Sequence, residues 1–477
     1  MRSIAGQTVF LALCVGEVSV SLIIVCLYYL AFYPDLHSFL HSFTAIFLLV
    51  SIIAMALSVI FIIYTVRTNG LTKRKIAMMS ATNLLMLILT VGSVEIGIRL
   101  IAKPTLTGET FRGILLKPRQ WSRVKAQYDE VLQQIDQGHA FLIYDPLLGW
   151  TVAPSRQNNT GQNMSSAEGL RSPQVGIRFA DRHTRHSGSS PNPTTYRIAL
   201  LGDSMTYGNE VRCEDTWGHV LETNINTDVQ VLNFGVSAYG LNQVLLRYQR
   251  DVRPWKPQIV IIGITSLEIQ RLTWIYKFLN PYWSGDPFAY PRLVFANGTF
   301  LHINQPPIPP TEITSHAAVK DLPYIELDSN YRRLDWERNG TWQLLEKSYL
   351  FRFLISITPS REAPQEVHSD TEMVKLSRHV LKAIVQEVQR DGAIPVVIHL
   401  PYQYELMNVA NDAKYIPFSL QILDGSGIGH LDLTSCLLDG KAINDYMPKG
   451  HYSPKANAVI SNCLAPIVRD KLSKAFR

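Results

Sequence analysis

Three long apolar runs in the first hundred residues constrain this chain more than any other feature. They extend over Thr8–Tyr33, Phe43–Val66 and Ile76–Ile98. Each is longer than the roughly 20 residues that cross about 30 Å of hydrocarbon. The first run is too long for a signal peptide, and only Arg2 precedes it as a basic region. We therefore expect residues 1–103 to form a membrane domain with three transmembrane helices.

The loops between these runs differ in positive charge, which predicts their orientation. The loop Pro34–Ser42 has no Lys or Arg, whereas the loop Arg67–Lys75 has four. Short loops rich in Lys and Arg remain in the cytoplasm, so the chain after Ile98 should lie outside it. We expect a multi-pass protein that contacts the lipid bilayer and has a periplasmic or extracellular soluble part.

Charge and cysteine content exclude several other classes of protein. The formal net charge is +6, but Lys and Arg are scattered rather than clustered, which argues against nucleic-acid binding. The five cysteines form no CxxC or Cys/His spacing, so we expect no metal site, and no motif indicates a cofactor. Cys436 and Cys463 could pair in an oxidising compartment, although spacing alone leaves this open.

The remainder of the chain divides into a connector and an α/β region. We assign residues 104–195 to an extracytoplasmic connector, with a helical pattern over Trp121–Gln137. From residue 196 to 477, short apolar runs without alternation are separated by helical patterns, which predicts a parallel sheet buried on both faces. The predicted strands are Arg197–Leu201, Val229–Asn233, Gln258–Gly263, Ile394–Leu400 and His430–Leu433.

A long insertion, about residues 274–364, separates the third and fourth predicted strands. It is rich in aromatic residues and proline. Two interpretations are open: the aromatic side chains pack a small core of their own, or they form a wall that stacks on sugar or acyl groups.

Three motifs carry candidate chemistry, and each follows a predicted strand or precedes a helix. Gly202-Asp203-Ser204 comes directly after the first strand, where a tight turn exposes a serine hydroxyl and its N–H. Asn233–Gly240 follows the second strand, and its Gly235 lets the backbone approach an acyl group. His451 lies before a helix that should start near Pro454. Alone, the first motif is equally typical of a helix cap, the second of a turn and the third of an exposed histidine.

Together and in this order, the motifs resemble the SGNH/GDSL hydrolase superfamily, and in particular its membrane-anchored bacterial type. Upstream, Tyr144–Trp150 and Ala167–Arg171 are similar to segments that precede the domain in such proteins. The resemblance implies a three-layer, flavodoxin-like α/β fold with a parallel sheet. It implies that Ser204 is the nucleophile and that His451 is the general base. It also implies that the N–H groups of Ser204 and Gly235 bind the oxyanion of an acyl-serine reaction.

Two departures from the family pattern affect the site. The family's third block carries an Asn as oxyanion donor, but the chain reads Gly263–Glu268 without one, so Ser266 or Thr265 is the candidate substitute. The family also has an Asp three residues before the histidine, and Pro448 holds that position. Asp445, six residues before His451, is the candidate acid; otherwise the site is a Ser-His dyad.

The resemblance implies an enzyme, a serine esterase or O-acyltransferase without a cofactor. Its substrate class is an acylated carbohydrate or other ester, with O-acetyl groups of an envelope glycan as the first candidate. An inactive domain that binds polysaccharide or a partner protein is the alternative from another class, and a lipase or thioesterase is a further one.

Overall fold

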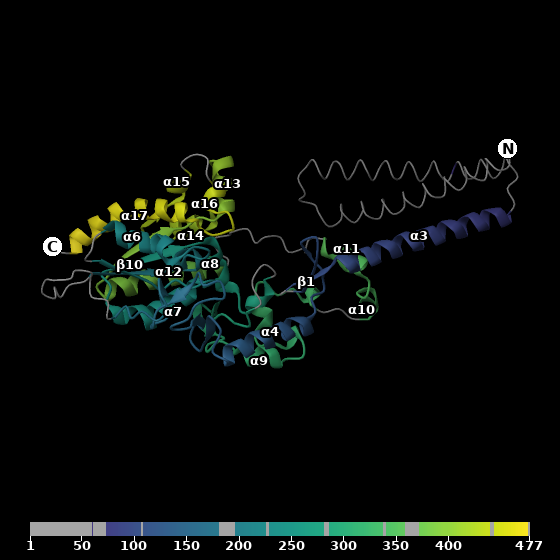
Figure 1. Ribbon diagram of the computed structural model, residues 1–477, viewed down its shortest axis with the longest axis horizontal. Helices are drawn as coiled ribbons and strands as arrows, with labels where there is room; N and C mark the ends of the chain where they lie inside the picture. Colours follow the sequence, from purple (N-terminus) through teal and green to yellow (C-terminus); the bar gives the residue numbers. More distant parts are fainter. Residues whose placement is uncertain are drawn as a thin grey trace. The chain divides into compact units, whose positions relative to one another are not determined.

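The computed structural model describes most of the chain after residue 72. The described ranges are 73–105, 108–180, 196–225, 229–280, 286–336, 340–357, 372–438 and 443–475, together with Ile60. The chain divides into two compact units (Figure 1). Residues 1–120 and 333–366 form the first, and residues 121–332 and 367–477 form the second.

The first unit contains one long helix and several short elements. Helix α3, Lys73–Ile101, covers the third predicted transmembrane run. The first run lies outside the described residues, as does the second apart from Ile60. Within the described ranges, no helix has the length and apolarity needed to cross a membrane. The other elements of this unit are β1 (Lys103–Thr105), β2 (Gly108–Phe111), β3 (Ile114–Leu115), a 3₁₀ turn (Arg333–Asp335), α10 (Thr341–Leu345) and α11 (Tyr349–Ser356).

Helix α11 belongs to the predicted insertion, yet it is attached to α3. The carboxylate of Glu95 on α3 accepts hydrogen bonds from the N–H groups of Tyr349 and Leu350 at 2.9 and 2.8 Å. It also accepts the hydroxyl of Ser348 at 2.8 Å. An acidic group at this position satisfies the unpaired donors of the first helical turn and opposes the positive end of the helix dipole. The insertion is therefore shared between the two units.

The second unit is built on a five-stranded parallel sheet with the order β14-β13-β10-β8-β9. Each predicted strand is found to within two residues at either end, which confirms the predicted α/β class. The strands are β8 (Tyr196–Leu201), β9 (Val229–Asn233), β10 (Ile259–Ile264), β13 (Ile394–His399) and β14 (His430–Asp432).

Helices cover both faces of this sheet, and alternate side chains of each strand explain why. In β8, Ile198 and Leu200 pack in one buried cluster with Trp217, whereas Ala199 and Leu201 pack in the other. Buried residues of α6 (Trp217–Ile225) and α17 (Pro454–Ala475) belong to the first cluster, and those of α7 (Leu241–Arg247), α12 (Glu372–Arg390) and α14 (Phe418–Asp424) belong to the second. The result is a three-layer fold whose strands all end at one edge.

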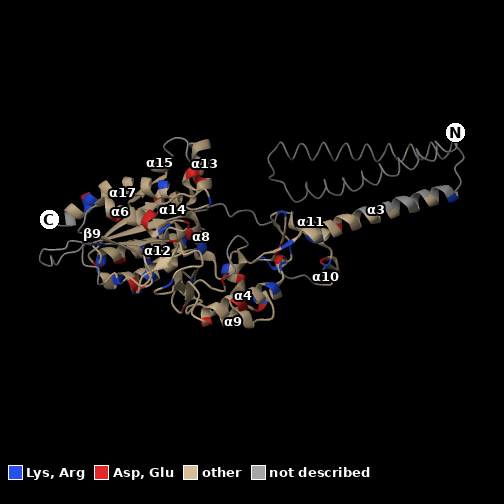
Figure 2. Cartoon of the chain, in the orientation of Figure 1, with Lys and Arg blue, Asp and Glu red and all other residues tan. Residues whose placement is uncertain are grey.

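Shorter elements complete the second unit. Helices are α4 (Trp121–Asp136), α5 (Ser204–Tyr207), α8 (Ser266–Gln270), α9 (Pro310–Ser315), α13 (Gln403–Asn411), α15 (Thr434–Leu437) and α16 (Ile443–Tyr446). Strands outside the main sheet are β4 (Leu142–Asp145), β5 (Gly149–Val152), β6 (Met164–Ser165), β7 (Arg171–Ser172), β11 (Arg292–Ala296) and β12 (Thr299–Ile303). Figure 2 shows acidic and basic residues interspersed over these elements.

Part of the predicted connector is integral to the second unit. Leu170 and Phe179 are buried in the same apolar cluster as β8 and α12. The unit begins at Trp121, so the boundary seen in the structure precedes the boundary expected near residue 196.

Several aromatic residues of the insertion that lie in this unit pack against one another and against the connector. Trp274, Phe288 and Tyr290 are buried in one cluster with Trp150 and Tyr239. These side chains form a small core and are not exposed as a stacking wall. Two further aromatic residues of the insertion, Tyr282 and Trp283, lie outside the described residues.

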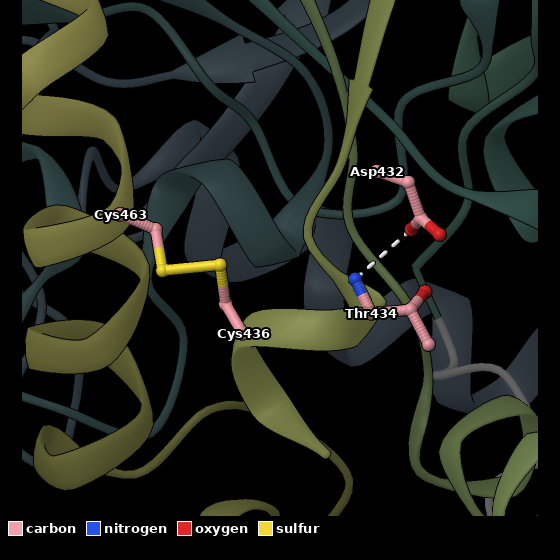
Figure 3. Close-up of a disulfide and its surroundings, with 4 residues drawn as sticks. All are labelled: Asp432, Thr434, Cys436 and Cys463. Atoms are coloured by element: carbon pink, nitrogen blue, oxygen red, sulfur yellow. Dashed lines mark hydrogen bonds between the residues drawn. A yellow bond between two sulfur atoms is a disulfide. The ribbon is translucent and has the colours of Figure 1, made fainter. Parts of the chain in front are cut away.

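A disulfide joins Cys436 on α15 to Cys463 on α17, with 6.6 Å between the Cα atoms (Figure 3). The open possibility that these two cysteines pair is therefore confirmed. At the start of α15, the Asp432 carboxylate accepts the Thr434 N–H at 2.9 Å. The disulfide thus ties the segment after β14 to the C-terminal helix.

We expect that loss of this disulfide destabilises the second unit by about 2–4 kcal/mol, because the bond closes a loop of 27 residues in the unfolded chain. Cys436→Ala, Cys463→Ala and the double variant should lower the free energy of unfolding equally, since each removes the same bond. Denaturant unfolding of the purified protein measures this effect. Additive losses in the double variant would show that the two cysteines act independently.

Candidate active site

The serine turn directly follows the central strand β8. Gly202 has a φ of 149°, and a side chain there would meet the hydroxyl of Thr206 at 2.3 Å and the carbonyl of Gly263 at 2.8 Å. Ser204 then starts the single helical turn α5, which Gly208 ends in the left-handed conformation. Within the described residues, the N–H of Ser204 has no hydrogen-bond acceptor. This turn therefore places a hydroxyl and an unbonded N–H together at the carboxyl end of the strand.

The carboxylate of Asp203 holds this turn in place through hydrogen bonds. One oxygen accepts the N–H of Met205 at 2.9 Å. The other accepts three side chains from neighbouring segments: Thr265 at 3.0 Å, Arg271 at 2.9 Å and Tyr402 at 3.1 Å. Burial and the nearby Asp203 raise the pKa of Tyr402 well above its usual value, so its hydroxyl remains a donor. The ends of β8, β10 and β13 are joined through one buried carboxylate.

His451 reaches Ser204 from the loop before α17. Its Nε2 atom lies 2.9 Å from the Ser204 hydroxyl oxygen. The next residue anchors the loop, because the Tyr452 hydroxyl donates to the Pro401 carbonyl at 2.7 Å. Asn457 on α17 donates to the carbonyl of Tyr452 at 3.1 Å. The structure thus brings together the two residues that the sequence motifs singled out.

The partner of the second imidazole nitrogen is Glu210, and not Asp445. Nδ1 of His451 lies 3.1 Å from a carboxylate oxygen of Glu210. Asp445 is exposed on α16 and makes no hydrogen bond to His451, so the expectation for Asp445 was wrong. The physical reason is that the turn α16 buries Tyr446 and the following Met447 in the core, which leaves the Asp445 side chain facing solvent. Glu210 carries no sequence signal, because the family pattern places the acid next to the histidine.

Gly235 does not offer its N–H to a substrate. The N–H donates to the side-chain oxygen of Asn233 at 2.9 Å, and Asn233 in turn donates to the Thr206 carbonyl at 2.8 Å. A side chain at Gly235 would come within 2.7 Å of the Tyr207 nitrogen. Gly235 is therefore required for close packing of two loops, which corrects its expected role as oxyanion donor.

Ser266 is also occupied by other partners. Its hydroxyl donates to Glu405, lies 3.1 Å from the Ser419 hydroxyl and accepts the Ser419 N–H at 3.0 Å. All three residues are buried. Thr265 donates to Asp203. The expected substitute donors in this block are therefore part of the framework behind the site.

The turn after β9 is held beside the serine turn by several contacts. The Ser237 hydroxyl donates to the Asn209 side chain at 2.8 Å, and Trp150 donates to the Ser237 carbonyl at 3.2 Å. Ala238 is buried with a φ of 65°, and Tyr290 donates to its carbonyl at 3.1 Å. A non-glycine residue persists in this strained region only where its surroundings determine it. In the part of the chain that is described, the N–H groups of Ser237 and Ala238 have no acceptor.

Comparisons with known proteins give limited information. No protein-family model and no curated protein sequence matches the chain. Among solved structures, a lipolytic protein of the G-D-S-L family from Desulfitobacterium hafniense matches 57% of this chain and 99% of its own, with 15% identity and a TM-score of 0.29. A carbohydrate acetylesterase family member from Sinorhizobium meliloti matches 58% of this chain and 99% of its own, with 12% identity and a TM-score of 0.28.

A third match is an acetyl-xylooligosaccharide esterase mutant from Geobacillus, which covers 57% of this chain and 94% of its own with 12% identity and a TM-score of 0.30. At these identities and TM-scores, the matches assign neither a family nor an activity to the chain.

The two candidate acids make opposite predictions. Glu210→Gln removes the charge beside Nδ1 of His451, and we expect turnover of an ester to fall by roughly 10–100-fold. This is less than the roughly 10⁴-fold effect of a fully buried acid, because the Glu210 side chain is 34% exposed. Asp445→Asn should leave turnover unchanged. Steady-state rates and melting temperatures of both variants test this, and a large loss in Asp445→Asn alone would contradict the assignment.

The buried pair of Asp203 and Arg271 makes a prediction about stability. Neither side chain is exposed to solvent, so Arg271→Met leaves a buried carboxylate without its cation. We expect a loss of about 3–5 kcal/mol in the free energy of unfolding. Arg253→Met is the control, because Arg253 pairs with Glu387 at the surface and should contribute about 1 kcal/mol or less. Equal losses in the two variants would contradict the central role of the buried pair.

Proposed function

We propose that this chain is a serine hydrolase or acyltransferase that acts on esters through an acyl-serine intermediate. One observation carries the proposal: a continuous chain of contacts links Glu210, His451 and Ser204, with distances of 3.1 and 2.9 Å. The acid and the serine come from one loop, and the imidazole comes from a loop 247 residues after the serine. Such an arrangement is the general requirement for activating a hydroxyl nucleophile.

In the first step, the Ser204 oxygen attacks the carbonyl carbon of the ester while Nε2 of His451 accepts its proton. The carbonyl oxygen becomes an oxyanion, and the N–H of Ser204 together with those of Ser237 and Ala238 are the proposed donors to it. The intermediate collapses, the bond to the alcohol oxygen breaks, and His451 returns the proton to the leaving alcohol. Glu210 accepts the hydrogen bond of the Nδ1–H and so keeps the other proton of the imidazole on Nδ1.

In the second step, water or another hydroxyl attacks the acyl-serine. His451 accepts the proton of the incoming group, and the proton passes to Ser204 when the serine leaves. Water gives a free carboxylic acid, whereas a sugar hydroxyl gives a new ester. The residues of the site act in the same way in both cases, so hydrolysis and transfer differ only in the acceptor.

The substrate class and location are part of this proposal. The sequence resemblance to SGNH/GDSL hydrolases favours O-acyl groups, and O-acetyl groups on an envelope glycan in particular. The disulfide between Cys436 and Cys463 favours an oxidising compartment. It supports the extracytoplasmic placement that the basic loop Arg67–Lys75 predicts. We propose that the three apolar runs anchor the site at the membrane surface.

A fluorophosphonate probe tests the nucleophile directly. We expect covalent labelling of wild type at Ser204 and none in Ser204→Ala, as read by mass spectrometry. Ser435→Ala is the matched control, because Ser435 is an exposed serine on α15 outside the site. An ester panel with acetylated glycans, free sugars and long-chain esters then identifies the acyl group and the acceptor.

Three outcomes of this panel have different meanings. Release of acetate or its transfer to a sugar would support the proposal. Turnover of long-chain esters alone would identify a lipase or thioesterase. Absence of both labelling and turnover in the intact protein would favour a binding domain and overturn the proposed activity.

A further inference from the structure

The β6–β7 hairpin of the connector reaches the loop that carries Glu210. Arg171 on β7 is almost completely buried, with 2% of its surface exposed. Its Nη2 atom donates to the Val211 carbonyl at 2.7 Å, and its guanidinium group donates twice to the Gln162 carbonyl at 3.2 Å. The residue whose carbonyl it holds is the immediate neighbour of Glu210.

The environment of Arg171 is unusual for a buried cation. In the described part of the chain no carboxylate pairs with it. Arg171 also lies over the ring of Tyr207, with 4.9 Å between its Cζ atom and the ring centroid. Burial raises the pKa of the Tyr207 phenol to about 12, so this ring stays neutral and offers its face to the cation. Burying a cation without a counterion is unfavourable. The hydrogen bonds to the two carbonyls are therefore the interactions that offset this cost.

Glu210 needs external support in order to face His451. It lies in the left-handed region with a φ of 68°, a conformation that is unfavourable for a residue with a long side chain. Its side chain is also partly exposed, so packing does not fix its direction. On one side, Asn209 N–H bonds the Ser204 carbonyl at 3.2 Å. On the other side, Arg171 holds Val211.

We propose that Arg171 is a positioning residue of the active site, which holds the Glu210 loop so that the carboxylate meets Nδ1 of His451. This inference rests on the proposed Ser204-His451-Glu210 site and extends it to the connector. Arg171 touches neither the substrate nor the reacting atoms. It acts through Val211, and the connector is by this account a part of the catalytic unit.

The hairpin that carries Arg171 is itself rigidly held, which this role requires. The Ser166 hydroxyl accepts the N–H groups of Glu168 and Leu170 at 3.1 and 3.2 Å. Gly169 has a φ of 77°, and a side chain there would meet the Val152 carbonyl at 2.9 Å. Leu170 is inserted in the core of the unit. The motif Ala167–Arg171 therefore forms a fixed base for the arginine.

The experiment compares Arg171→Met with Glu210→Gln and with the double variant in the full-length protein. We expect Arg171→Met to lower kcat for a short acyl ester by roughly 10-fold with KM little changed, since a misplaced catalytic group costs rate rather than binding. Added to Glu210→Gln, it should lower kcat no further, because the carboxylate that it positions is already gone. Arg171→Lys retains one donor and should recover part of the rate.

Arg292→Met is the matched control. Arg292 is equally buried, donates to the Leu272 carbonyl at 2.9 Å and pairs with Glu372. Among the described residues it makes no hydrogen bond to Ser204, His451 or Glu210. We expect this variant to lower the melting temperature and to leave the coupling with Glu210→Gln at zero. A second readout is the ¹H resonance of the His451 Nδ1–H in ¹⁵N-histidine-labelled protein. Its low-field position should be lost in both Glu210→Gln and Arg171→Met, and kept in Arg292→Met.

The outcomes separate this inference from the proposed function. If wild type shows no labelling or turnover, the proposed function fails. If Glu210→Gln keeps full activity, the site is a dyad and the proposed role of Glu210 fails. If Glu210→Gln loses activity but Arg171→Met only lowers stability, adds its effect independently or keeps the Nδ1–H resonance, the positioning role of Arg171 alone is overturned.

Discussion

The buried carboxylate of Asp203 is the interaction on which the geometry of this molecule depends. It precedes the serine and accepts hydrogen bonds from three side chains of the second unit: Thr265, Arg271 and Tyr402. Without this common acceptor, the loops that follow the three strands could move independently of one another. A single anion satisfied by four donors gives them one arrangement, because any movement of a loop would leave a buried charge short of a partner. The serine turn is rigid because the buried carboxylate must keep all of its hydrogen-bond donors.

The connector contributes a second layer of support, and its two motifs act on different loops. Trp150 of the first motif donates to the Ser237 carbonyl and accepts the Tyr239 hydroxyl at its own carbonyl. Arg171 of the second motif binds the loop after the serine turn. Together they hold two loops that border the site. A segment that is rich in loops by composition can therefore be as well ordered as the sheet, provided that its polar groups are satisfied.

The sequence predicts the sheet well and the site only in part, and the difference has a physical basis. Runs such as Ile259–Ile264 can be recognised as strands, because burial on both faces requires uninterrupted apolar residues. The proximity of Ser204 and His451 could be predicted because their motifs have fixed positions relative to those strands. Glu210, Gly235 and Ser266 could not be assigned correctly, since their roles depend on which partner each polar group meets. That choice is made by loop conformation, as in the left-handed φ of Glu210, which spacing does not encode.

The position of Glu210, the proposed acid, bears on which substitutions the chain can accept. Pro448 and the two residues after it are exposed and make no hydrogen bond to the imidazole, whereas the preceding Tyr446 and Met447 are buried in the core. On the proposed assignment of Glu210, residues 448–450 can therefore vary in sequence more freely than the turn after Gly208. If Glu210 is the acid of the site, as proposed above, the histidine loop and the serine turn are under different constraints, because only the serine turn must hold both a nucleophile and its acid in place.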